Sequence, residues 1–363
     1  MYGLPIKIAI VKPVGDGCNM RCDYCFSGGG ISKIDIMSTD IAKKIIDKLM
    51  SQEDVGKVNF IWHGGEPLLR GIAFFKEIFE YQKRYRINRR FDYVNAIQSN
   101  LTLFNDNWKK LFLDYGITVS TSLDGTEFMN DKHRRFANGS GSYNLVVERI
   151  KSAKKAGLLV NVLVVISKTN MNYPEEIFKM FNNLNIDEVC FLPCVSMKNT
   201  IVKHCSLDPG DYAKFLLPFF DLYINNQCSF KVREFDQFFL GSLNLCGGVC
   251  NFTGNCQNFV SINSRGDVYA CDTVPEIDEY RFGNIVNQGL EVILNSMQRK
   301  NFIENTHHLS EECIRCDYRN VCNNGCYNMR VGGHYCFCQD RKKIYRYVLD
   351  TVRTVIKKGG VKL

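Results

Sequence analysis

Three cysteines near the amino terminus are the residues of this sequence that most clearly indicate a chemical function. Cys18, Cys22 and Cys25 lie in the segment CNMRCDYC, just after a short apolar run. A [4Fe–4S] cluster normally takes four thiolates, one for each iron. Three thiolates at this spacing would leave one iron open to a small ligand, as catalytic zinc sites keep one position for water. Spacing alone also allows a zinc site with a distant fourth ligand, or three free thiols.

A second motif, HGGEP at residues 63–67, follows the next apolar run. Its two glycines allow the backbone to approach a ligand closely, and Glu66 can accept hydrogen bonds from an ammonium group. If both apolar runs are neighbouring parallel strands, both motifs leave the sheet at its carboxyl end, where β/α loops build active sites. Two motifs in such loops favour one shared ligand site over a chance turn and scattered thiols.

Apolar runs alternate with helical patterns up to about Pro193, and this alternation predicts parallel β/α units. The expected strands are short, as is typical of strands buried on both faces. They are Ile8–Val11, Val58–Trp62, Tyr93–Ile97, Val119–Leu123, Val160–Ile166 and Val189–Leu192. The expected helices are Thr39–Met50, Ile72–Tyr85, Asp106–Tyr115, Tyr143–Ala156, Pro174–Leu184 and, after a linker, Asp211–Asn225. Six strands are too few for a closed eight-stranded barrel. The predicted fold class is therefore α/β, a partial (β/α)6 TIM-like barrel.

The character of the chain changes at Cys246, because glycine and cysteine become frequent and helical periodicity fades until Asp340. Such a segment cannot easily fill a core with apolar side chains, and metal binding can supply the missing folding free energy. The expected domains are the partial barrel at 1–205, a helical linker at 206–245, a cysteine-rich domain at 246–340 and a basic C-terminal helix at 341–363.

Composition limits where the chain works and what it binds. The short apolar run at the amino terminus contains Lys7, so it is neither a signal peptide nor a membrane span. We predict a cytoplasmic location, where disulfides are rare, so the seventeen cysteines indicate metal thiolates or core thiols. The net charge of +8 is modest, and the basic run at 83–90 comes with no stacking-aromatic motif or zinc-finger spacing. Neither nucleic acid nor a membrane is an expected partner.

The CxxxCxxC spacing with Tyr24 before its third cysteine, together with GGEP after the next strand, resembles the radical S-adenosylmethionine (SAM) superfamily. The resemblance implies that the three cysteines hold a [4Fe–4S] cluster whose open iron chelates the amino and carboxylate groups of SAM. It also implies that the segment of Gly64, Gly65 and Glu66 holds the methionine amino group. An electron from the cluster then breaks the sulfonium bond, and a 5′-deoxyadenosyl radical abstracts hydrogen from the substrate. The protein must position and shield that radical.

The carboxyl-terminal cysteines resemble the SPASM extension of radical SAM enzymes, which carries two auxiliary [4Fe–4S] clusters. The pattern C-x9-G-x4-C at 256–271 is followed by C-x2-C-x5-C-x3-C at 313–326 and by a last cysteine. Cys338 is preferred to Cys336, because only Cys338 fits the family's C-x3-K-x2-aromatic helix. The implied ligand sets are Cys250, Cys256, Cys271 and Cys326 for one cluster, and Cys313, Cys316, Cys322 and Cys338 for the other. A structural domain with two zinc ions is the alternative. The cysteines outside these sets are expected to be structural or incidental thiols: Cys190, Cys194, Cys205, Cys228 and Cys246.

Most of the chain, about residues 7–357, resembles the anaerobic sulfatase-maturating enzymes and related peptide maturases. Its QSN segment at 98–100 resembles the family's QTN segment, and its SLDG segment matches another family segment. The resemblance makes Tyr24, Ser122, Asp124 and Arg134 candidate SAM-binding residues.

Two further residues are candidates for catalysis. Asp272 follows Cys271 directly, like the aspartate that is the proposed base of sulfatase maturases; a hydrogen-bond acceptor near the cluster is the alternative. His63 stands where sulfatase maturases usually have glutamine, and HGGEP is commoner among SPASM enzymes that act on ribosomally made peptides. His63 is a candidate substrate contact or proton acceptor, with a core histidine as the alternative. Leu101 replaces the glycine of the family's QTNG, and both departures count against formylglycine chemistry.

The leading hypothesis is a radical SAM SPASM enzyme that cleaves SAM reductively and oxidatively modifies a side chain of a peptide or protein. It would be a ribosomal-peptide maturase that forms a thioether or carbon–carbon cross-link. The alternative within the enzyme class is a sulfatase maturase that converts Cys or Ser to formylglycine. A non-catalytic iron–sulfur electron carrier, which would need no SAM pocket, and a zinc-binding scaffold belong to other classes.

The expected partners follow from this hypothesis. They are a peptide or protein substrate and a reducing electron donor such as flavodoxin or ferredoxin. Only seventeen residues precede Cys18. Recognition of a leader peptide is therefore expected to use a separate binding protein or the enzyme's own surface.

Overall fold

The structure, a computed structural model, describes residues 5–28, 30–53, 55–89, 91–196, 204–243, 245, 247–254 and 256–357. Cys246, the expected start of the cysteine-rich domain, lies outside these residues. The chain forms two compact units. The first contains Met1–Leu123, Asn130–Val162 and Cys256–Thr306, and the second contains Asp124–Met129, Leu163–Asn255 and His307–Leu363. The expected domain boundaries remain predictions, because compact units and family domains need not coincide.

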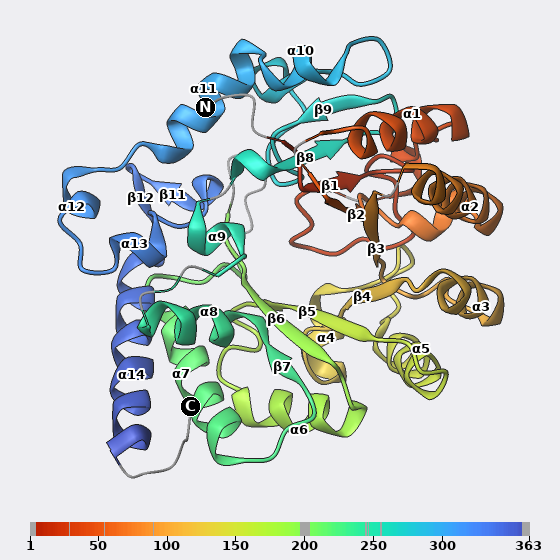
Figure 1. The fold of residues 1–363 in the computed structure, drawn as a ribbon. Helices are drawn as coiled ribbons and strands as arrows, with labels where there is room; N and C mark the ends of the chain where they lie inside the picture. Colours follow the sequence, from red (N-terminus) through yellow and green to blue (C-terminus); the bar gives the residue numbers. More distant parts are fainter. Residues whose placement is uncertain are drawn as a thin grey trace. The chain divides into compact units, whose positions relative to one another are not determined.

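A parallel sheet forms the centre of the first unit, as the strand–helix alternation predicted (Figure 1). Its strands β1 to β4 lie in chain order, each parallel to the next. Val11 pairs with Trp62 and Trp62 pairs with Ile97, so the first three strands end at nearly the same level. The loops that follow them therefore leave the same edge of the sheet. The bounds are β1 Ile8–Val11, β2 Lys57–Trp62, β3 Asp92–Gln98 and β4 Thr118–Ser122, and β5 Val160–Ile166 begins in this unit.

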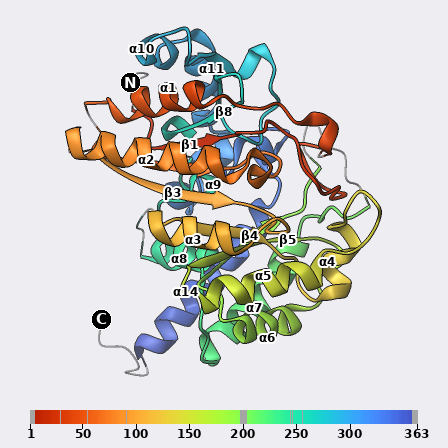
Figure 2. The same ribbon diagram turned by 90° about the vertical axis from the view of Figure 1, so that its right-hand side faces the viewer.

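The helices of the first unit begin and end at capping residues that the sequence shows. α1 (Thr39–Met50) begins after Ser38, whose hydroxyl accepts a hydrogen bond from a backbone N–H of the first turn. α3 (Asp106–Tyr115) begins after Asn105, which caps it in the same way, and ends at Gly116 with a φ of 62°. Figure 2 shows α1, α2 and α3 along one face of the sheet. The remaining bounds are α2 Ile72–Arg89, α5 Tyr143–Lys155, η1 Ile31–Lys33 and η2 Pro67–Arg70, together with α4 Glu127–His133, which begins in the second unit and ends in the first.

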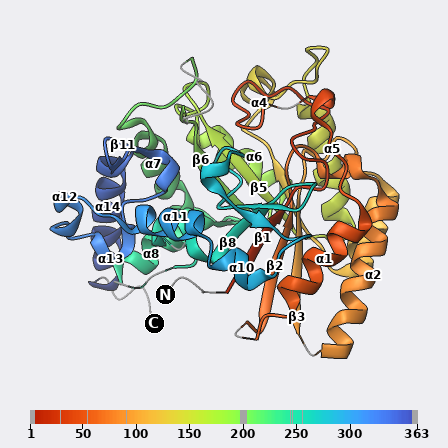
Figure 3. The same cartoon turned by 90° about the horizontal axis from the view of Figure 1, so that it is seen from above.

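Three strands from the carboxyl-terminal part of the chain join the same sheet, which the sequence did not predict. β8 (Phe259–Ile262) pairs in parallel with β1, and the two run side by side in Figure 3. β9 (Asp267–Tyr269) pairs antiparallel with β8, and β10 (Arg281–Asn284) pairs antiparallel with β9. Because these strands have only three or four residues each, they give no periodic pattern that can be recognised.

α11 (Met297–His307) was also not predicted, because its inner face is not uniformly apolar. It buries Arg299 and Thr306 together with Phe302. The guanidinium of Arg299 donates to the carbonyl oxygen of Leu294 over 3.0 Å. A helix that buries polar groups in this way lacks the apolar stripe by which helices are recognised in sequences. The short elements nearby are η3 Cys256–Asn258, η4 Asp278–Tyr280 and α10 Leu290–Leu294.

The second unit packs helices around a cluster of aromatic side chains. The rings of Phe191 and Phe219 lie 4.7 Å apart between centroids, and Phe215 contacts both. In the described part of the chain, no helix combines the length and the apolar character needed to cross a bilayer. The bounds are α6 Pro174–Leu184, β6 Glu188–Pro193, α7 Asp211–Asn225, β7 Lys231–Val232, α8 Arg233–Ser242, α9 Cys250–Thr253, α12 Glu311–Ile314, α13 Arg319–Cys322, η5 Tyr327–Met329, β11 Arg330–Val331, β12 His334–Tyr335 and α14 Cys338–Lys357.

Helix α7 is capped by a residue far away in the sequence. The carboxylate of Asp340, which is buried, accepts hydrogen bonds from the backbone N–H groups of Gly210 and Ala213, each over 2.8 Å. These N–H groups are among the four that a helix cannot satisfy internally at its start. The first turn of α14 thereby fixes the start of α7.

We expect Asp340→Asn to lower the free energy of unfolding by about 1–2 kcal/mol, because an amide oxygen cannot serve both N–H groups. Urea unfolding followed by circular dichroism measures this change. Asp350→Asn is the matched control, since Asp350 is exposed on the same helix and forms only a surface pair with Arg353. Equal effects of the two substitutions would contradict the capping role.

Candidate active site and cluster-binding residues

The loop after β1 carries the three amino-terminal cysteines in a partly buried position. Cys18, Cys22 and Cys25 are all half-buried, and the N–H of Cys25 donates to the carbonyl of Cys22. The Sγ atom of Cys18 accepts hydrogen bonds from Met20 N over 3.4 Å and from the Asn100 amide over 3.7 Å. Burial raises the pKa of the Cys18 thiol to about 11. The thiolate that iron requires therefore depends on the positive charge of the bound metal.

The loop after β2 rests on the cysteine loop through its two glycines. The N–H of Gly65 donates to the Gly15 carbonyl over 3.0 Å, and the N–H of Glu66 donates to the Gly17 carbonyl over 2.8 Å. Gly64 has a φ of 105°, and a Cβ at either glycine would collide with a carbonyl oxygen of the other loop. We expected these glycines to let the backbone approach a ligand. In the structure, the two glycines instead allow the two loops to approach each other closely.

Glu66 is fully buried, with 0% of its surface exposed, and accepts three hydrogen bonds. Its Oε1 accepts from Ser99 Oγ (2.7 Å) and Leu68 N (3.0 Å), and its Oε2 accepts from Asn100 N (2.7 Å). Burial raises the pKa of Glu66 to about 7, although these hydrogen bonds act in the opposite direction. A carboxylate has about four acceptor sites, so one remains for a further donor. Glu66 thus joins the loops that follow β2 and β3.

Leu101, the residue that departs from the family's glycine, keeps a conformation typical of glycine. Its φ is 58°, in the left-handed region, and its side chain is fully buried. Its N–H donates to Ser99 Oγ over 2.9 Å, which helps to hold the turn. A left-handed leucine costs about 1–2 kcal/mol, and burial of its side chain offsets about the same amount. The substitution therefore preserves the loop.

The other predicted SAM-binding residues have partners within the protein. The guanidinium of Arg134 lies over the ring of Tyr24, 5.3 Å from the centroid. Ser122 Oγ accepts a hydrogen bond from the Gln98 amide over 3.3 Å. Asp124, in the second unit, is buried, and its carboxylate accepts from a backbone N–H of β5 over 2.9 Å. Contact with SAM remains a prediction for these residues, and Asp124 also has a structural role.

The two residues predicted for catalysis lie beside each other in the first unit. The Nε2 atom of His63 is 3.6 Å from Oδ2 of Asp272, and the Cys271 thiol donates to Oδ1 of Asp272 over 3.2 Å. The Nδ1 atom of His63 is buried without a hydrogen-bond partner among the described residues. Burial lowers the pKa of the imidazole, and the Asp272 carboxylate counteracts part of this effect. A neutral imidazole beside a carboxylate can accept a proton.

Lys12 is a residue near this pair that the sequence analysis missed. It is buried at the end of β1, and its Nζ atom lies 3.2 Å from Asp16 and 2.9 Å from Glu276. Burial alone would lower the pKa of Lys12, but these carboxylates outweigh it, so its pKa lies above the usual value. Its charge also acts on His63 and Asp272. The sequence contained a signal for Lys12, because a lysine directly after the apolar run IAIV is unusual and lysine is rarely buried.

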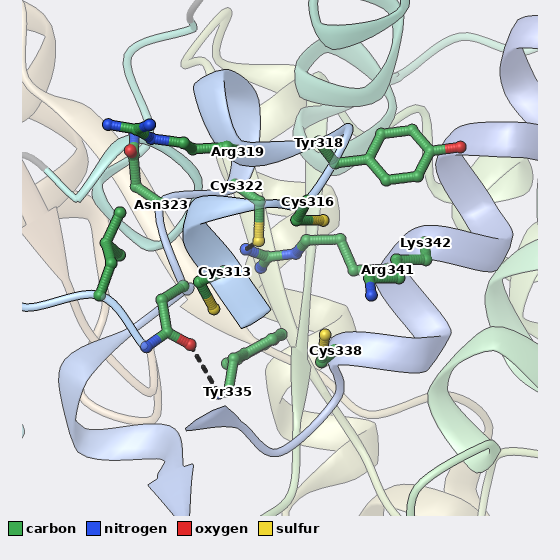
Figure 4. A pocket seen from close by; sticks show the side chains of 12 residues that line it. Cys313, Cys316, Tyr318, Arg319, Cys322, Asn323, Tyr335, Cys338, Arg341 and Lys342 are labelled. Atoms are coloured by element: carbon green, nitrogen blue, oxygen red, sulfur yellow. Dashed lines mark hydrogen bonds between the residues drawn. The ribbon is translucent and has the colours of Figure 1, made fainter. Parts of the chain in front are cut away.

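Four of the carboxyl-terminal cysteines line one pocket of the second unit (Figure 4). They are the four that the sequence analysis assigned to the second auxiliary cluster: Cys313, Cys316, Cys322 and Cys338. Cys336 is not among the lining residues, and its N–H donates to the carbonyl of Met329 over 2.9 Å. Four thiolate donors around one pocket fit a [4Fe–4S] cluster, which takes one thiolate per iron. The preference for Cys338 over Cys336 is consistent with this arrangement.

The ligands predicted for the other auxiliary cluster are divided between the two units. Cys256 and Cys271 belong to the first unit, whereas Cys250 and Cys326 belong to the second. This ligand set therefore remains a prediction. Cys190, Cys194 and Cys205 are buried thiols, as their assignment as structural residues implies, and Cys228 is half-buried.

Comparisons with known proteins agree with this architecture. A family model described as the radical SAM superfamily matches residues 13–181, and one described as an iron–sulfur cluster-binding SPASM domain matches residues 250–317. The cysteine-type anaerobic sulfatase-maturating enzyme of Clostridium novyi (strain NT) is 31% identical over 327 residues, which are 87% of this chain and 87% of that protein. The serine-type enzyme of Bacteroides thetaiotaomicron is 30% identical over 348 residues, 90% of this chain and 83% of that protein. The solved structure of native anSMEcpe with bound AdoMet and Kp18Cys peptide has a TM-score of 0.87 and 26% identity, and covers 98% of this chain and 100% of that one.

The fold, the motifs and the matches together define an iron–sulfur enzyme that uses SAM. The chain belongs to the radical SAM superfamily, in the group that carries a SPASM domain and includes the anaerobic sulfatase-maturating enzymes. The resemblance drawn from the motifs is therefore confirmed. SAM and [4Fe–4S] clusters, the predicted cofactors, are those of this family.

Proposed function

We propose that this enzyme oxidises one side chain of a peptide or protein substrate by removing two hydrogen atoms. The observation that supports the proposal is the contact between His63 and Asp272, because imidazole and carboxylate groups can both accept a proton and this pair lies next to Cys271. When bound, the first cluster and SAM supply a 5′-deoxyadenosyl radical, which takes one hydrogen atom and leaves as 5′-deoxyadenosine. The second hydrogen leaves the substrate radical as a proton and an electron.

The residues around Asp272 are arranged to accept that proton. The Asp272 carboxylate lies 3.6 Å from the imidazole of His63, and either group can take a proton from the substrate and share it with the other. The buried charge of Lys12 acts on both groups and, together with burial, lowers the pKa of the His63 imidazole, which keeps the imidazole neutral. The electron would leave toward an auxiliary cluster.

Formylglycine is the product that the comparisons favour. The chain is similar over most of its length to enzymes of both the cysteine type and the serine type. Removal of two hydrogens from a serine side chain gives the aldehyde directly. Removal of two hydrogens from a cysteine gives a thioaldehyde, which water converts to the aldehyde with release of hydrogen sulfide.

A cross-link within a peptide is the second candidate, and His63 is the residue that favours it. Histidine replaces the glutamine that sulfatase maturases usually have at this position, and its ring lies beside the proposed base. A cross-link needs the same loss of two hydrogens but gives no carbonyl group. A separate leader-binding protein, a flavodoxin or ferredoxin as electron donor, and a cytoplasmic location remain predictions for either product.

Anaerobic turnover with SAM and reductant tests the proposal. The substrates are sulfatase peptides with Cys or Ser at the modified position, and precursor peptides encoded near the enzyme. Mass spectrometry and capture with a hydrazide reagent then identify the product. A captured aldehyde supports formylglycine, and a loss of two hydrogens without an aldehyde supports a cross-link. If 5′-deoxyadenosine never forms, the proposal is wrong, and the result favours a non-catalytic electron carrier.

Asp272→Asn separates proton transfer from SAM cleavage. We expect product formation to fall by about 10² or more, because a positioned base contributes about that factor, while uncoupled 5′-deoxyadenosine formation continues. Asp278→Asn is the control, since Asp278 is exposed in the same segment. If Asp272→Asn lowers the formation of 5′-deoxyadenosine as much as that of the modified peptide, Asp272 belongs to the SAM site instead.

A further inference from the structure

The four-cysteine pocket of the second unit contains a buried cation that neither the motifs nor the proposed function assigns. Arg341 lies on the first turn of α14, three residues after Cys338, and only 4% of its surface is exposed. Its Nη1 atom lies 3.5 Å from the sulfur of Cys322. Figure 4 shows the side chain running from α14 toward Cys322, with cysteine sulfurs on both sides of it.

The guanidinium is held in place on several sides. Nη1 also donates to the carbonyl oxygen of Asn251 over 2.9 Å. The Cζ atom lies 4.2 Å from the ring centroid of Phe252 and 4.3 Å from that of Tyr335. Two aromatic faces and a fixed carbonyl leave the planar group little freedom, and its orientation toward the sulfur is therefore preorganised.

The charges around this pocket are unbalanced. Its lining includes the basic residues Arg319, Arg341 and Lys342, and no Asp or Glu side chain among the described residues. The neighbouring carboxylate of Asp340 is turned to the start of α7, where two backbone N–H groups bind it. Asp340 therefore does not pair with Arg341. The charge of Arg341, which is permanent in proteins, is available to the cysteines.

A permanent buried cation beside the thiolates has a definite effect on a cluster bound there. Adding an electron makes a thiolate-bound cluster more negative by one charge, and a nearby cation stabilises that form. A hydrogen bond to a ligand sulfur acts in the same direction, and hydrogen bonds to the sulfurs and net charge are known determinants of cluster potential.

We propose that Arg341 raises the reduction potential of the auxiliary cluster held by Cys313, Cys316, Cys322 and Cys338. The cluster then accepts an electron more readily than its thiolates alone would allow. This inference deepens the proposed function, because the substrate radical must lose an electron to an acceptor. Arg341 is a positioning and tuning residue in this view, since it touches a ligand and not the substrate.

Potentiometric titration of the reconstituted full-length chain, followed by electron paramagnetic resonance, tests the proposal without any substrate. The first cluster is removed by Cys18→Ala, Cys22→Ala and Cys25→Ala, and the titrant is dithionite with redox mediators. The reduction wave that disappears in Cys316→Ser belongs to this pocket. We expect Arg341→Gln to lower the midpoint potential of that wave and Arg341→Lys, which keeps the charge, to leave it close to the parent value.

Arg319→Gln is the matched control. Arg319 lines the same pocket, but it is exposed and its side chain points away from the sulfurs in Figure 4. Solvent should screen its charge, so a small shift at most is expected. If Arg319→Gln lowers the midpoint potential as much as Arg341→Gln does, the effect does not depend on where the charge lies, and the proposal is overturned.

The remaining outcomes are also decisive. An unchanged potential in Arg341→Gln would leave Arg341 with only a packing role, and equal drops in the Gln and Lys variants would show that its charge is not what raises the potential. If Arg341→Gln loses the iron of this site, Arg341→Met, which also removes the charge but keeps a long side chain, applies the same test, and an unchanged potential there would overturn the proposal. Such failures leave the proposed function intact, because peptide oxidation is measured separately. Conversely, a lowered potential without any peptide product would overturn only the proposed function.

Discussion

Replacement of Cys18, Cys22 and Cys25 together by alanine should abolish SAM cleavage while most of the iron remains bound. The three thiolates are the expected ligands of the cluster that binds SAM, and the loop has no other cysteine. If the chain holds three [4Fe–4S] clusters, iron should fall from about twelve to about eight atoms per chain. Iron analysis after anaerobic reconstitution and chromatography of 5′-deoxyadenosine measure the two quantities.

Cys228→Ala is the control for this experiment. Cys228 is half-buried, its thiol donates to the carbonyl of Phe230 over 3.4 Å, and it belongs to none of the predicted ligand sets. Both iron content and SAM cleavage should be unchanged in this variant. Normal SAM turnover in the triple variant would falsify the assignment of the radical-generating site to this loop.

Glu66→Gln should reduce SAM cleavage by about 30-fold or more. Glutamine fills the same space, but its NH₂ group cannot accept the hydrogen bonds that reach Glu66 from two sides. Loss of hydrogen bonds to a buried charged group costs about 2 kcal/mol. If this free energy is lost from stabilisation of the transition state, the rate of SAM cleavage falls by about 30-fold. The rate of 5′-deoxyadenosine formation measures the effect.

A double-mutant cycle with Ser99→Ala shows whether the effect passes through the bond between the two residues. If Ser99 acts through Glu66, the double variant should be little worse than Glu66→Gln alone. Glu77→Gln is the control, because Glu77 is a half-exposed residue on α2 that pairs with Lys43 at the surface. Additive losses would show that the two side chains support the site independently.

The pH dependence of SAM binding is a second consequence of Glu66. Because burial raises the pKa of Glu66 to about 7, the carboxylate is ionised above that pH and can accept all its hydrogen bonds. As the pH falls through about 7, a proton occupies one acceptor site and the arrangement is disturbed. SAM affinity, measured by equilibrium dialysis without reductant, should therefore fall below pH 7 in the parent and stay flat in Glu66→Gln. A flat profile in the parent would contradict this account.

Many helices and strands were predictable because their signals are local. β1 and β5 have the predicted bounds, and so do α1, α3, α6 and α7, since apolar runs and capping residues mark their ends. The resemblance to the SPASM pattern likewise implied the four cysteines that line the second-unit pocket. A ligand set can be recognised in a sequence when its residues lie on one or two short turns and at the start of a helix.

The parts that escaped prediction depend on contacts between distant segments. Nothing in the tripeptide DVY of β9 indicates that it completes a sheet begun by β1. The contact of His63 with Asp272 joins residues far apart in the chain, and only the family resemblance made both of them candidates. Arg341 was passed over, because a basic residue on a basic helix normally faces water.

The pairing of β1 with β8 has a consequence for how the enzyme is made. One edge of β1 is satisfied by β2 soon after synthesis begins, but the other must wait for Phe259–Ile262. Until then the nascent chain presents a row of unpaired backbone groups on an apolar strand, which is a template for aggregation. Fragments that stop before β8 should therefore need a chaperone or precipitate, even when they contain the whole SAM-binding segment.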